Sequence, residues 1–363
     1  MIDPRLEYAS TLPSRFYFDP AVLELENRNV FARTWQLVGN AAQVAEPGAY
    51  FTTVVAEEPL LVVRGGDGVL RAMSNVCRHR AGPIARGEGK RPVLQCGYHG
   101  WTYSLDGRLQ TTPEFDGVRG FDRAECVLPQ FRVEVWNELL FVNLDREAES
   151  LAEFLGELPA DMPRHDYRGF RLAHRKTWEL ECNWKVYVDN YLEGYHIPIV
   201  HPGLFRELDY PHYRTDVKRN YSIQIAPTRR PERIRGEDDV RYFWIFPNLM
   251  LNVYADNFST NLIVPLGPNR TATLFDWYFR DPESVRRQID ETVAFSDEIQ
   301  IEDIDICEAV QRGLRSRTYD TGRFSPRREN GVHHFHLLYA EAMGLIDHAG
   351  RAASTRAYTG QPA

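Results

Sequence analysis

The first part of the chain, from about residue 34 to residue 145, alternates short apolar runs with glycine-containing turns. YFTTVV, EPLLVVRG and VEVWNELLFVNL have the length and the β-branched or aromatic content of strands, and Asp67-Gly68 and Asp106-Gly107 are typical of hairpin turns. This pattern predicts a small, mostly antiparallel β domain.

From about residue 151 the pattern changes to a mixture of helical and extended segments. It predicts one helix over residues 182–196 and a longer one over residues 282–314, which Asp281 can cap and in which Pro282 suits the first turn. Between them, the runs YSIQIA, YFWIFPNLMLNVYA, STNLIVPLG and TATLFDWYF predict sheet strands. A second domain that combines helices with a sheet is therefore expected.

The length of 363 residues allows two domains, each with a core of its own. We assign residues 34–145 to the first domain and residues 1–33 and 146–345 to the second. Residues 346–363 are rich in Ala and small polar residues, which predicts a flexible tail.

Composition narrows the class of protein. A net charge of −8 argues against a nucleic-acid partner, because phosphate binding requires a basic surface. No apolar run approaches the roughly 18 residues of a membrane helix, and no signal-peptide pattern is present, so a cytoplasmic protein without a membrane partner is expected. The five cysteines are interpreted as reduced thiols and metal ligands rather than disulfides.

The stretch CRHRAGPIARGEGKRPVLQCGYHGW places Cys77 beside His79 and Cys96 beside His99. A structural zinc site usually takes two cysteines from one arm, and a zinc knuckle with unusual ligand order is the alternative interpretation. One Cys and one His from each arm instead suit a Rieske [2Fe–2S] cluster, in which one iron has two thiolates and the other two imidazoles. The motif therefore predicts a centre that accepts and passes on single electrons.

A second candidate site contains His196 and His201, which follow an acidic predicted helix. On that helix Asp189, Glu193 and His196 would lie on one face, and Pro198 is expected to end the helix so that the chain turns back. Two imidazoles and one carboxylate with open positions form the facial triad of mononuclear Fe(II) oxygenases. The His spacing alone is weak evidence and would favour two core histidines.

Together, CRHRAG…CGYHGWTY and E-x-x-H-x4-H resemble the Rieske non-haem iron oxygenases over most of the chain, from about residue 16 to residue 339. The resemblance implies an α+β fold: an N-terminal antiparallel β Rieske domain, then a catalytic domain with an antiparallel sheet flanked by helices, of helix-grip or START-like type. It implies that Cys77 and Cys96 bind the inner iron of the cluster, and His79 and His99 the outer iron.

In this family the third ligand of the mononuclear iron is an aspartate on a late helix, and IQIEDIDICEAVQRGL is the matching segment. The resemblance thus implies His196, His201 and Asp303 as ligands, with Asp305 as the alternative to Asp303. The other acidic side chains of the segment are interpreted as solvated charges on the helix surface: Glu302 and Glu308.

The family also carries an acidic residue, more often aspartate, that bridges a Rieske histidine to a mononuclear-iron histidine of the neighbouring subunit. The resemblance implies this role for Glu193 between His99 and His196, and with it a head-to-tail ring, commonly a homotrimer. Asp189 either supports the same network or is a charge on the helix surface.

Two later segments, YFWIFPNLMLNVYADNFSTNLIVPLGP and EDIDICEAVQRGL…GVHHFH, resemble the branch of choline monooxygenase and of glycine betaine, carnitine and stachydrine oxygenases. This implies hydroxylation or N-demethylation of a quaternary ammonium compound, and aromatic faces bind such cations. The candidate cage residues, which core packing would equally explain, are Tyr187, Tyr191, Tyr195, Trp244, Phe246 and Tyr254. The histidine-rich VHHFH is interpreted as a packed strand.

The resemblance further implies O₂ as cosubstrate and electrons from NAD(P)H. No G-x-G-x-x-G follows a predicted strand, so a separate flavin and iron–sulfur reductase is expected to supply these electrons. Hydroxylation or demethylation of an aromatic acid is the alternative function, and an electron-transfer protein without catalysis is a remote one.

Overall fold

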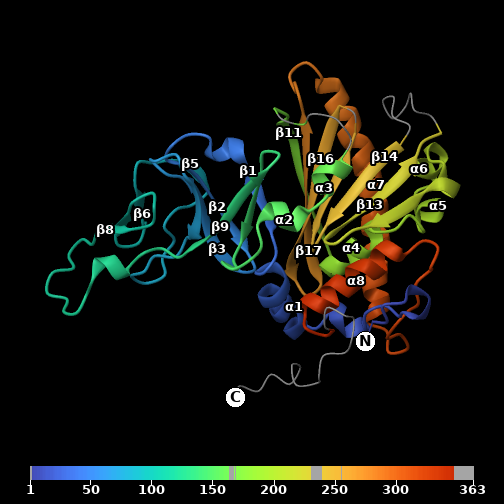
Figure 1. The fold of residues 1–363 in the computed structure, drawn as a ribbon, viewed down its shortest axis with the longest axis horizontal. Helices are drawn as coiled ribbons and strands as arrows, with labels where there is room; N and C mark the ends of the chain where they lie inside the picture. Colours follow the sequence, from blue (N-terminus) through green and yellow to red (C-terminus); the bar gives the residue numbers. More distant parts are fainter. Residues whose placement is uncertain (1, 163–166, 168, 230–238, 255, 347–363) are drawn as a thin grey trace. The chain divides into compact units, whose positions relative to one another are not determined.

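The computed structural model describes residues 2–162, 167, 169–229, 239–254 and 256–346. The chain divides into two compact units, Asn27–Phe154 and a second one formed by Met1–Glu26 with Leu155–Ala363 (Figure 1). The first unit is wider at both ends than the predicted range 34–145. The predicted flexible tail lies, except for Ile346, outside the described residues.

The smaller unit consists of antiparallel β structure. Its main sheet has the order β1-β10-β9-β4-β3-β2-β5, and a second sheet has the order β6-β7-β8. The bounds are β1 Gln36–Asn40, β2 Ala49–Val55, β3 Glu58–Arg64, β4 Leu70–Ser74, β5 Glu88–Lys90, β6 Leu94–Gln95, β7 Thr102–Tyr103, β8 Leu109–Thr111, β9 Gln130–Trp136 and β10 Leu139–Asn143. Gly68 and Gly107 have φ of 78° and 87°, which confirms both predicted hairpin turns.

The larger unit is built on a seven-stranded antiparallel sheet of order β11-β17-β16-β15-β14-β13-β12. Its strands are β11 Arg171–Leu180, β12 Arg214–Val217, β13 Tyr221–Pro227, β14 Asp239–Ile245, β15 Leu249–Val253, β16 Asn257–Gly267 and β17 Arg270–Phe279. In the described part of both units, the α-helices are α1 Pro20–Glu26, α2 Leu151–Leu155, α3 Leu158–Asp161, α4 Trp184–Tyr191, α5 Ile197–Val200, α6 Pro202–Glu207, α7 Arg286–Leu314 and α8 Asn330–Ala342. Helix α4 packs against β16, α7 and α8 (Figure 1).

A buried ion pair fixes the start of α4. Lys185 Nζ lies 2.5 Å from Glu26 Oε1, and both side chains are completely buried. Trp184 Nε1 and the Tyr339 hydroxyl donate to the same carboxylate, at 2.8 and 2.6 Å. A charged pair is stable in the interior only when its remaining polar atoms are satisfied, and these donors meet that need. The N-terminal segment, α4 and α8 are thereby joined at one point.

The structure corrects three predicted elements. The predicted helix 182–196 is broken: α4 ends at Tyr191, where the N–H of Leu192 donates to Val188, and Pro198 lies in the first turn of α5 instead of ending a helix. The long helix α7 begins at Arg286 rather than at residue 282. VHHFH belongs to α8 and not to a strand, because Val332, Phe335 and Tyr339 are buried at helical spacing.

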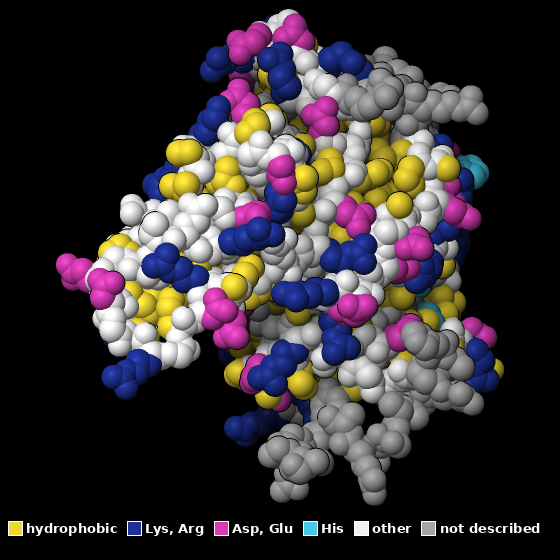
Figure 2. Space-filling view, turned by 60° about the vertical axis from the view of Figure 1, so that its left-hand side comes forward, with side chains coloured by type: hydrophobic (Ala, Val, Ile, Leu, Met, Phe, Trp, Pro, Cys, Tyr) yellow, Lys and Arg dark blue, Asp and Glu magenta, His cyan; other side chains and the backbone are white. Residues whose placement is uncertain are grey.

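Basic and acidic side chains are interspersed over the face shown in Figure 2. None of the helices in the described part of the chain has both the length and the apolar content that a bilayer crossing needs.

Candidate metal centres and the substrate cavity

The first candidate centre is formed by two loops of the smaller unit that are closed in the same way. Cys77 N–H donates to Gly82 and Ala81 N–H to Cys77; likewise Cys96 N–H donates to Trp101 and Gly100 N–H to Cys96. Each loop therefore starts on its cysteine and presents its histidine near the tip. This local geometry follows from the short motif, which is why the sequence reveals it.

The two loops bring their histidine rings into contact. Cys77 and Cys96 are unpaired thiols, 3% and 2% exposed, and the ring centroids of His79 and His99 lie 4.6 Å apart. His79 Nδ1 is buried and has no hydrogen-bond partner among the described residues, so it is available as a ligand. A Cβ on Gly82 would lie 3.1 Å from Cys96 Sγ, so glycine keeps this wall clear. The donor set fits a Rieske cluster.

Tyr103, a residue that the sequence analysis did not single out, contacts the first loop of this centre. Its hydroxyl accepts the N–H of Arg78 at 3.0 Å and lies 3.3 Å from Cys77 Sγ. When Cys77 binds a cluster as a thiolate it can only accept, so the Tyr103 hydroxyl would donate to its sulfur. Hydrogen bonds to cluster sulfurs stabilise the reduced form and raise the reduction potential.

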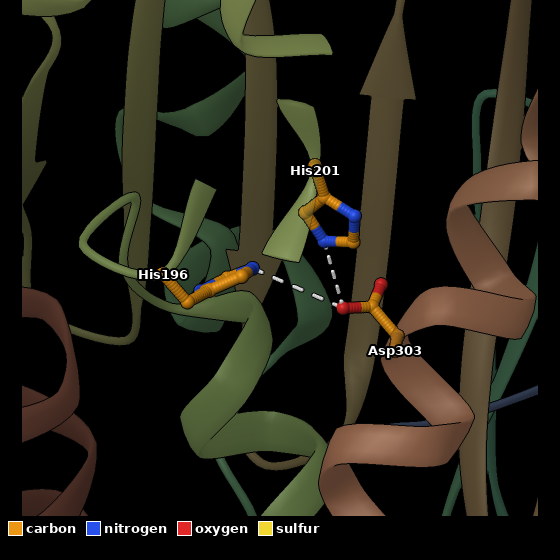
Figure 3. A group of neighbouring side chains, drawn as sticks. All are labelled: His196, His201 and Asp303. Atoms are coloured by element: carbon orange, nitrogen blue, oxygen red, sulfur yellow. Dashed lines mark hydrogen bonds and ion pairs between the residues drawn. The ribbon is translucent and has the colours of Figure 1, made fainter. Parts of the chain in front are cut away.

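The second candidate centre brings His196, His201 and Asp303 together in the larger unit (Figure 3). Their candidate ligand atoms all lie within 4.8 Å of one another. Asp303 Oδ1 is 3.0 Å from His201 Nε2 and 3.8 Å from His196 Nε2. Asp305, the alternative ligand, is exposed on α7. Two imidazoles and a carboxylate on one side of a cavity fit a facial-triad iron site.

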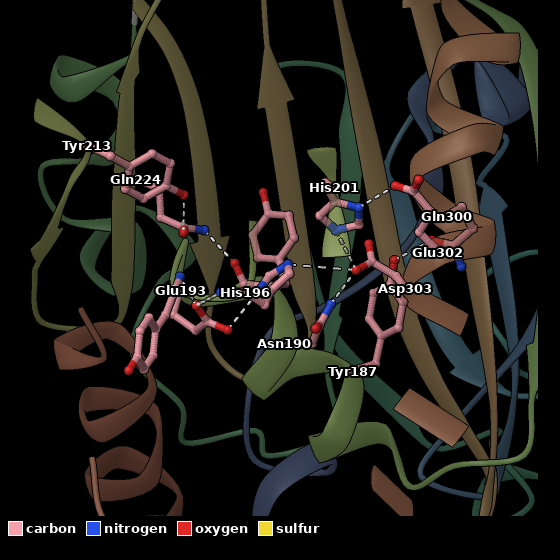
Figure 4. Close-up of polar contacts among 12 residues, drawn as sticks. Tyr187, Asn190, Glu193, His196, His201, Tyr213, Gln224, Gln300, Glu302 and Asp303 are labelled. Atoms are coloured by element: carbon pink, nitrogen blue, oxygen red, sulfur yellow. Dashed lines mark hydrogen bonds and ion pairs between the residues drawn. The ribbon is translucent and has the colours of Figure 1, made fainter. Parts of the chain in front are cut away.

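Each of these three groups is held by one further residue (Figure 4). Glu193 Oε1 is 2.7 Å from His196 Nδ1, Glu302 Oε2 is 2.6 Å from His201 Nδ1, and Asn190 Nδ2 donates to Asp303 Oδ1 at 2.6 Å. Both glutamates therefore contact Nδ1 and leave Nε2 turned toward the aspartate. The sequence analysis did not predict a role for Asn190. Its position on α4, the helix that precedes the iron-site histidines, could have indicated one.

One charge assignment needs correction. Glu302 is not simply a solvated surface charge, because its carboxylate contacts a histidine whose side chain is 2% exposed. The assignment of Glu308 to the helix surface is not contradicted: its carboxylate accepts the exposed backbone N–H of Glu181 at 3.0 Å. Burial lowers the pKa of His201, but its hydrogen bonds and charge interactions with Asp303 and Glu302 outweigh burial and raise the pKa above its ordinary value.

Asp189 does not share a face with Glu193, because the helix ends between them. Its Oδ2 accepts the Tyr17 hydroxyl at 2.7 Å, and its Oδ1 lies 2.9 Å from His336 Nε2. Asp189 thus ties α4 to the N-terminal segment and to α8. Glu193 instead stabilises the turn after the helix, since its carboxylate accepts the backbone N–H groups of Tyr195 and His196.

A cavity of about 540 Å³ opens beside the second centre. Its aromatic lining residues are Tyr187, Tyr191, Tyr213, Tyr242, Tyr254, Phe275, Trp277 and Phe295. Carboxylates also line it, from Glu193, Glu207, Glu291 and Asp303. Among the described residues of the lining there is no lysine or arginine.

Three of the six predicted cage residues line this cavity, and the cage itself stays a prediction. Tyr187, Tyr191 and Tyr254 line the cavity, whereas Tyr195 is 57% exposed outside it. Trp244 and Phe246 are core residues and not part of the described lining: the Trp244 ring packs 5.4 Å from Phe335, and its Nε1 donates to Pro247. Strand alternation was the signal for the residues missed on β17, Phe275 and Trp277, which share one face.

Comparison with known proteins identifies the class. Residues 34–122 match the Rieske [2Fe-2S] domain, and residues 168–345 match the ring hydroxylating alpha subunit (catalytic domain). The chain is 36% identical to the chloroplastic choline monooxygenase of Arabidopsis thaliana over 93% of its own length and 84% of that protein. The chain belongs to the Rieske non-haem iron oxygenases, as an oxygenase subunit.

More particular likenesses lie in one branch of that family. The carnitine monooxygenase oxygenase subunit of Escherichia coli is 34% identical over 92% of this chain and 94% of that one. The quaternary ammonium Rieske monooxygenase CntA in complex with L-carnitine has a TM-score of 0.84 at 31% identity, covering 93% of this chain and 97% of that chain. Naphthalene 1,2-dioxygenase from Rhodococcus, 18% identical with a TM-score of 0.76 over 92% and 94% of the two chains, shares the fold.

These comparisons confirm the predicted α+β fold and the two-domain order. As a Rieske non-haem iron monooxygenase, the protein uses a [2Fe–2S] cluster, a mononuclear iron and O₂. It is one component of a system in which a reductase provides the electrons.

Proposed function

We propose that the protein hydroxylates or N-demethylates a quaternary ammonium substrate. The observation that carries this proposal is the cavity beside His196, His201 and Asp303, which combines aromatic walls with carboxylates and has no lysine or arginine among its described lining residues. Choline and carnitine monooxygenases are relatives over nearly the whole chain, which supports the same substrate class.

The cavity suits a cation for two physical reasons. An ammonium group near the face of an aromatic ring gains about 0.5–2 kcal/mol, more as it is desolvated. Carboxylates of like sign around the cavity add an attractive field for a positive group and repel a negative one. An aromatic acid would require a positive side chain or converging backbone donors for its carboxylate, and the described lining offers no such side chain.

We assign the iron ligands to His196, His201 and Asp303. The cluster ligands are Cys77, His79, Cys96 and His99. When bound, the cluster supplies single electrons and the mononuclear iron supplies the activation of O₂ at its open positions.

The chain's own residues prepare this chemistry. Tyr191 and its aromatic neighbours hold the substrate's ammonium group and exclude water from the cavity. The Tyr191 hydroxyl is fixed by donating to Asn252 Oδ1 at 2.9 Å, and Tyr187 donates to Gln300 Oε1 at 2.5 Å, so both rings are held by hydrogen bonds. Burial raises the pKa of both tyrosines, so their hydroxyls stay neutral and add no charge to the cavity.

Glu193 carries the proposed bridge between the two kinds of centre. One oxygen contacts His196 Nδ1, and the carboxylate is 11% exposed. We assign its approach to His99 of a neighbouring subunit in a head-to-tail homotrimer, with electrons from a flavin and iron–sulfur reductase. Glu193→Gln, which retains an oxygen acceptor for the turn that contains His196, should keep both metal centres and a reducible cluster but stop product formation. Normal turnover would reject the bridge. A monomer by light scattering would reject the ring.

The function is tested by formaldehyde release and by hydroxylated product. The iron-loaded protein, with a surrogate reductase and NADH, is offered choline, glycine betaine, carnitine and stachydrine beside N- and O-methylated aromatic acids. Formaldehyde or aldehyde product from the quaternary ammonium compounds alone is expected. Product from the aromatic acids alone would overturn the substrate class. His201→Ala serves as the matched control for background oxidation.

A further inference from the structure

Glu302 contacts the second iron-site histidine from the side opposite Asp303. His201 lies between α5 and α6 with φ −116° and ψ 65°, outside regular helix geometry. Its ring is therefore oriented by side-chain contacts. Glu302 Oε2 is 2.6 Å from Nδ1, and Asp303 Oδ1 is 3.0 Å from Nε2.

The two carboxylates come from adjacent positions on α7. Successive helical residues project about 100° apart, so neighbouring side chains diverge and can reach opposite edges of one ring. Here they do so: the imidazole of His201 lies between Glu302 and Asp303, and it is 2% exposed, whereas Glu302 is 39% exposed. Of these two adjacent residues, Asp303 is a candidate iron ligand. Glu302 contacts Nδ1 of His201, the nitrogen that faces away from Asp303.

We infer that Glu302 is a positioning residue for the mononuclear iron. A neutral imidazole has one N–H and one acceptor nitrogen, and a carboxylate only accepts. With a metal bound at Nε2, the hydrogen of His201 is on Nδ1, where Glu302 Oε2 at 2.6 Å is placed to accept it. Carboxylate partners of ligating histidines fix the ring and increase its basicity as a ligand.

This role differs from that of Glu193. The Glu193 carboxylate also accepts backbone N–H groups of the turn that contains His196, so removing it disturbs the local fold as well as the ring. Glu302 lies within α7, where alanine is well tolerated, and its side chain acts on a residue 101 positions away. Its replacement therefore isolates the effect of positioning on metal binding.

The test measures Fe(II) affinity at the mononuclear site by chelator competition, with cluster absorbance as the check on folding. Glu302→Ala should bind Fe(II) about 10- to 100-fold more weakly, because partners of ligating histidines have effects of this size. Glu302→Gln retains an oxygen acceptor and should fall between Glu302→Ala and the unchanged protein. The matched control is Asp305→Asn, which removes an exposed charge from the same helix and should change nothing.

A second measurement does not depend on turnover: the visible spectrum of Co(II) bound at the site should shift in Glu302→Ala. Equal Fe(II) affinity in Glu302→Ala, Glu302→Gln and the unchanged protein would overturn the inference. The inference rests on the proposed assignment of His201 to iron, so His201→Ala is measured alongside. Loss of iron in His201→Ala with normal binding in Glu302→Ala rejects only the role of Glu302, whereas iron retained in His201→Ala rejects the ligand assignment.

Discussion

The two metal-binding regions differ in how the chain assembles them. The Rieske loops take four donors from residues 77–99, and each loop is closed by two backbone hydrogen bonds of its own. The second site joins His201 to Asp303, 102 positions away on another helix. The first centre is thus a local structure with its own geometry, whereas the second exists only when α4, α5 and α7 pack together.

The exposure of the histidines also differs between the two metal-binding regions. His99 is exposed at the tip of its loop, while His201 is 2% exposed and faces a cavity. An exposed histidine edge suits a centre that exchanges electrons with another protein surface. A triad that is 2–16% exposed and faces a cavity suits a centre that must hold a small substrate away from water. Short local motifs therefore form the centre that receives electrons, whereas tertiary packing forms the cavity in which the substrate reacts.

The largest expected effect separates the two regions completely. His201→Ala removes one of three donors and should empty the mononuclear site, so that about three irons per chain become about two. Product formation should stop, while the visible absorbance of the cluster remains. Iron analysis together with absorbance measures both outcomes.

The matched variant in the other region is Cys96→Ala. It should remove the cluster absorbance and leave Fe(II) binding at the mononuclear site. If either variant lost both signals, the two regions would not be independent, contrary to the compact units that the structure shows.

This contrast also explains what could be predicted from the sequence. The strands of the smaller unit and the Cys–His pairs were predictable because short-range spacing determines them. Glu302 and Trp244 were misjudged because their surroundings depend on distant elements: His201 in one case, α8 in the other. The break after Tyr191 was missed because the contacts of the Glu193 carboxylate, which stabilise it, are side-chain contacts that no hydrophobic period reveals.

A core substitution sharpens the distinction between cavity wall and packing. Trp244 is completely buried on β14 and contacts Phe335 of α8. Trp244→Ala should lower the free energy of unfolding by about 3–5 kcal/mol, as large-to-small changes of buried aromatics do. Chemical denaturation of the iron-loaded protein measures this. A large rise in KM with unchanged stability would instead place Trp244 in the cavity wall.

A partly buried histidine of the larger unit, His334, predicts a pH effect on the free energy of unfolding. Burial lowers the pKa of His334 on α8 from 6.5 to about 4. Between these values the unfolded chain binds a proton that the folded chain does not, so stability falls as pH drops from about 6.5 to 4, by roughly 3 kcal/mol. Denaturation midpoints across this range should flatten in His334→Gln. The control His212→Gln, at a side chain 75% exposed, should keep the slope.

The smallest effect concerns the cavity itself. Tyr254→Leu removes one aromatic face from the lining without touching a metal ligand. KM for a quaternary ammonium substrate should rise about 2- to 30-fold, the equivalent of 0.5–2 kcal/mol for one cation–π contact, with iron content unchanged. A neutral analogue with a tert-butyl group in place of the trimethylammonium separates charge from shape. If the KM for the neutral analogue rose as much as the KM for the cation, the Tyr254 ring would act by packing alone. The cavity wall at Tyr254 would then resemble the core around Trp244.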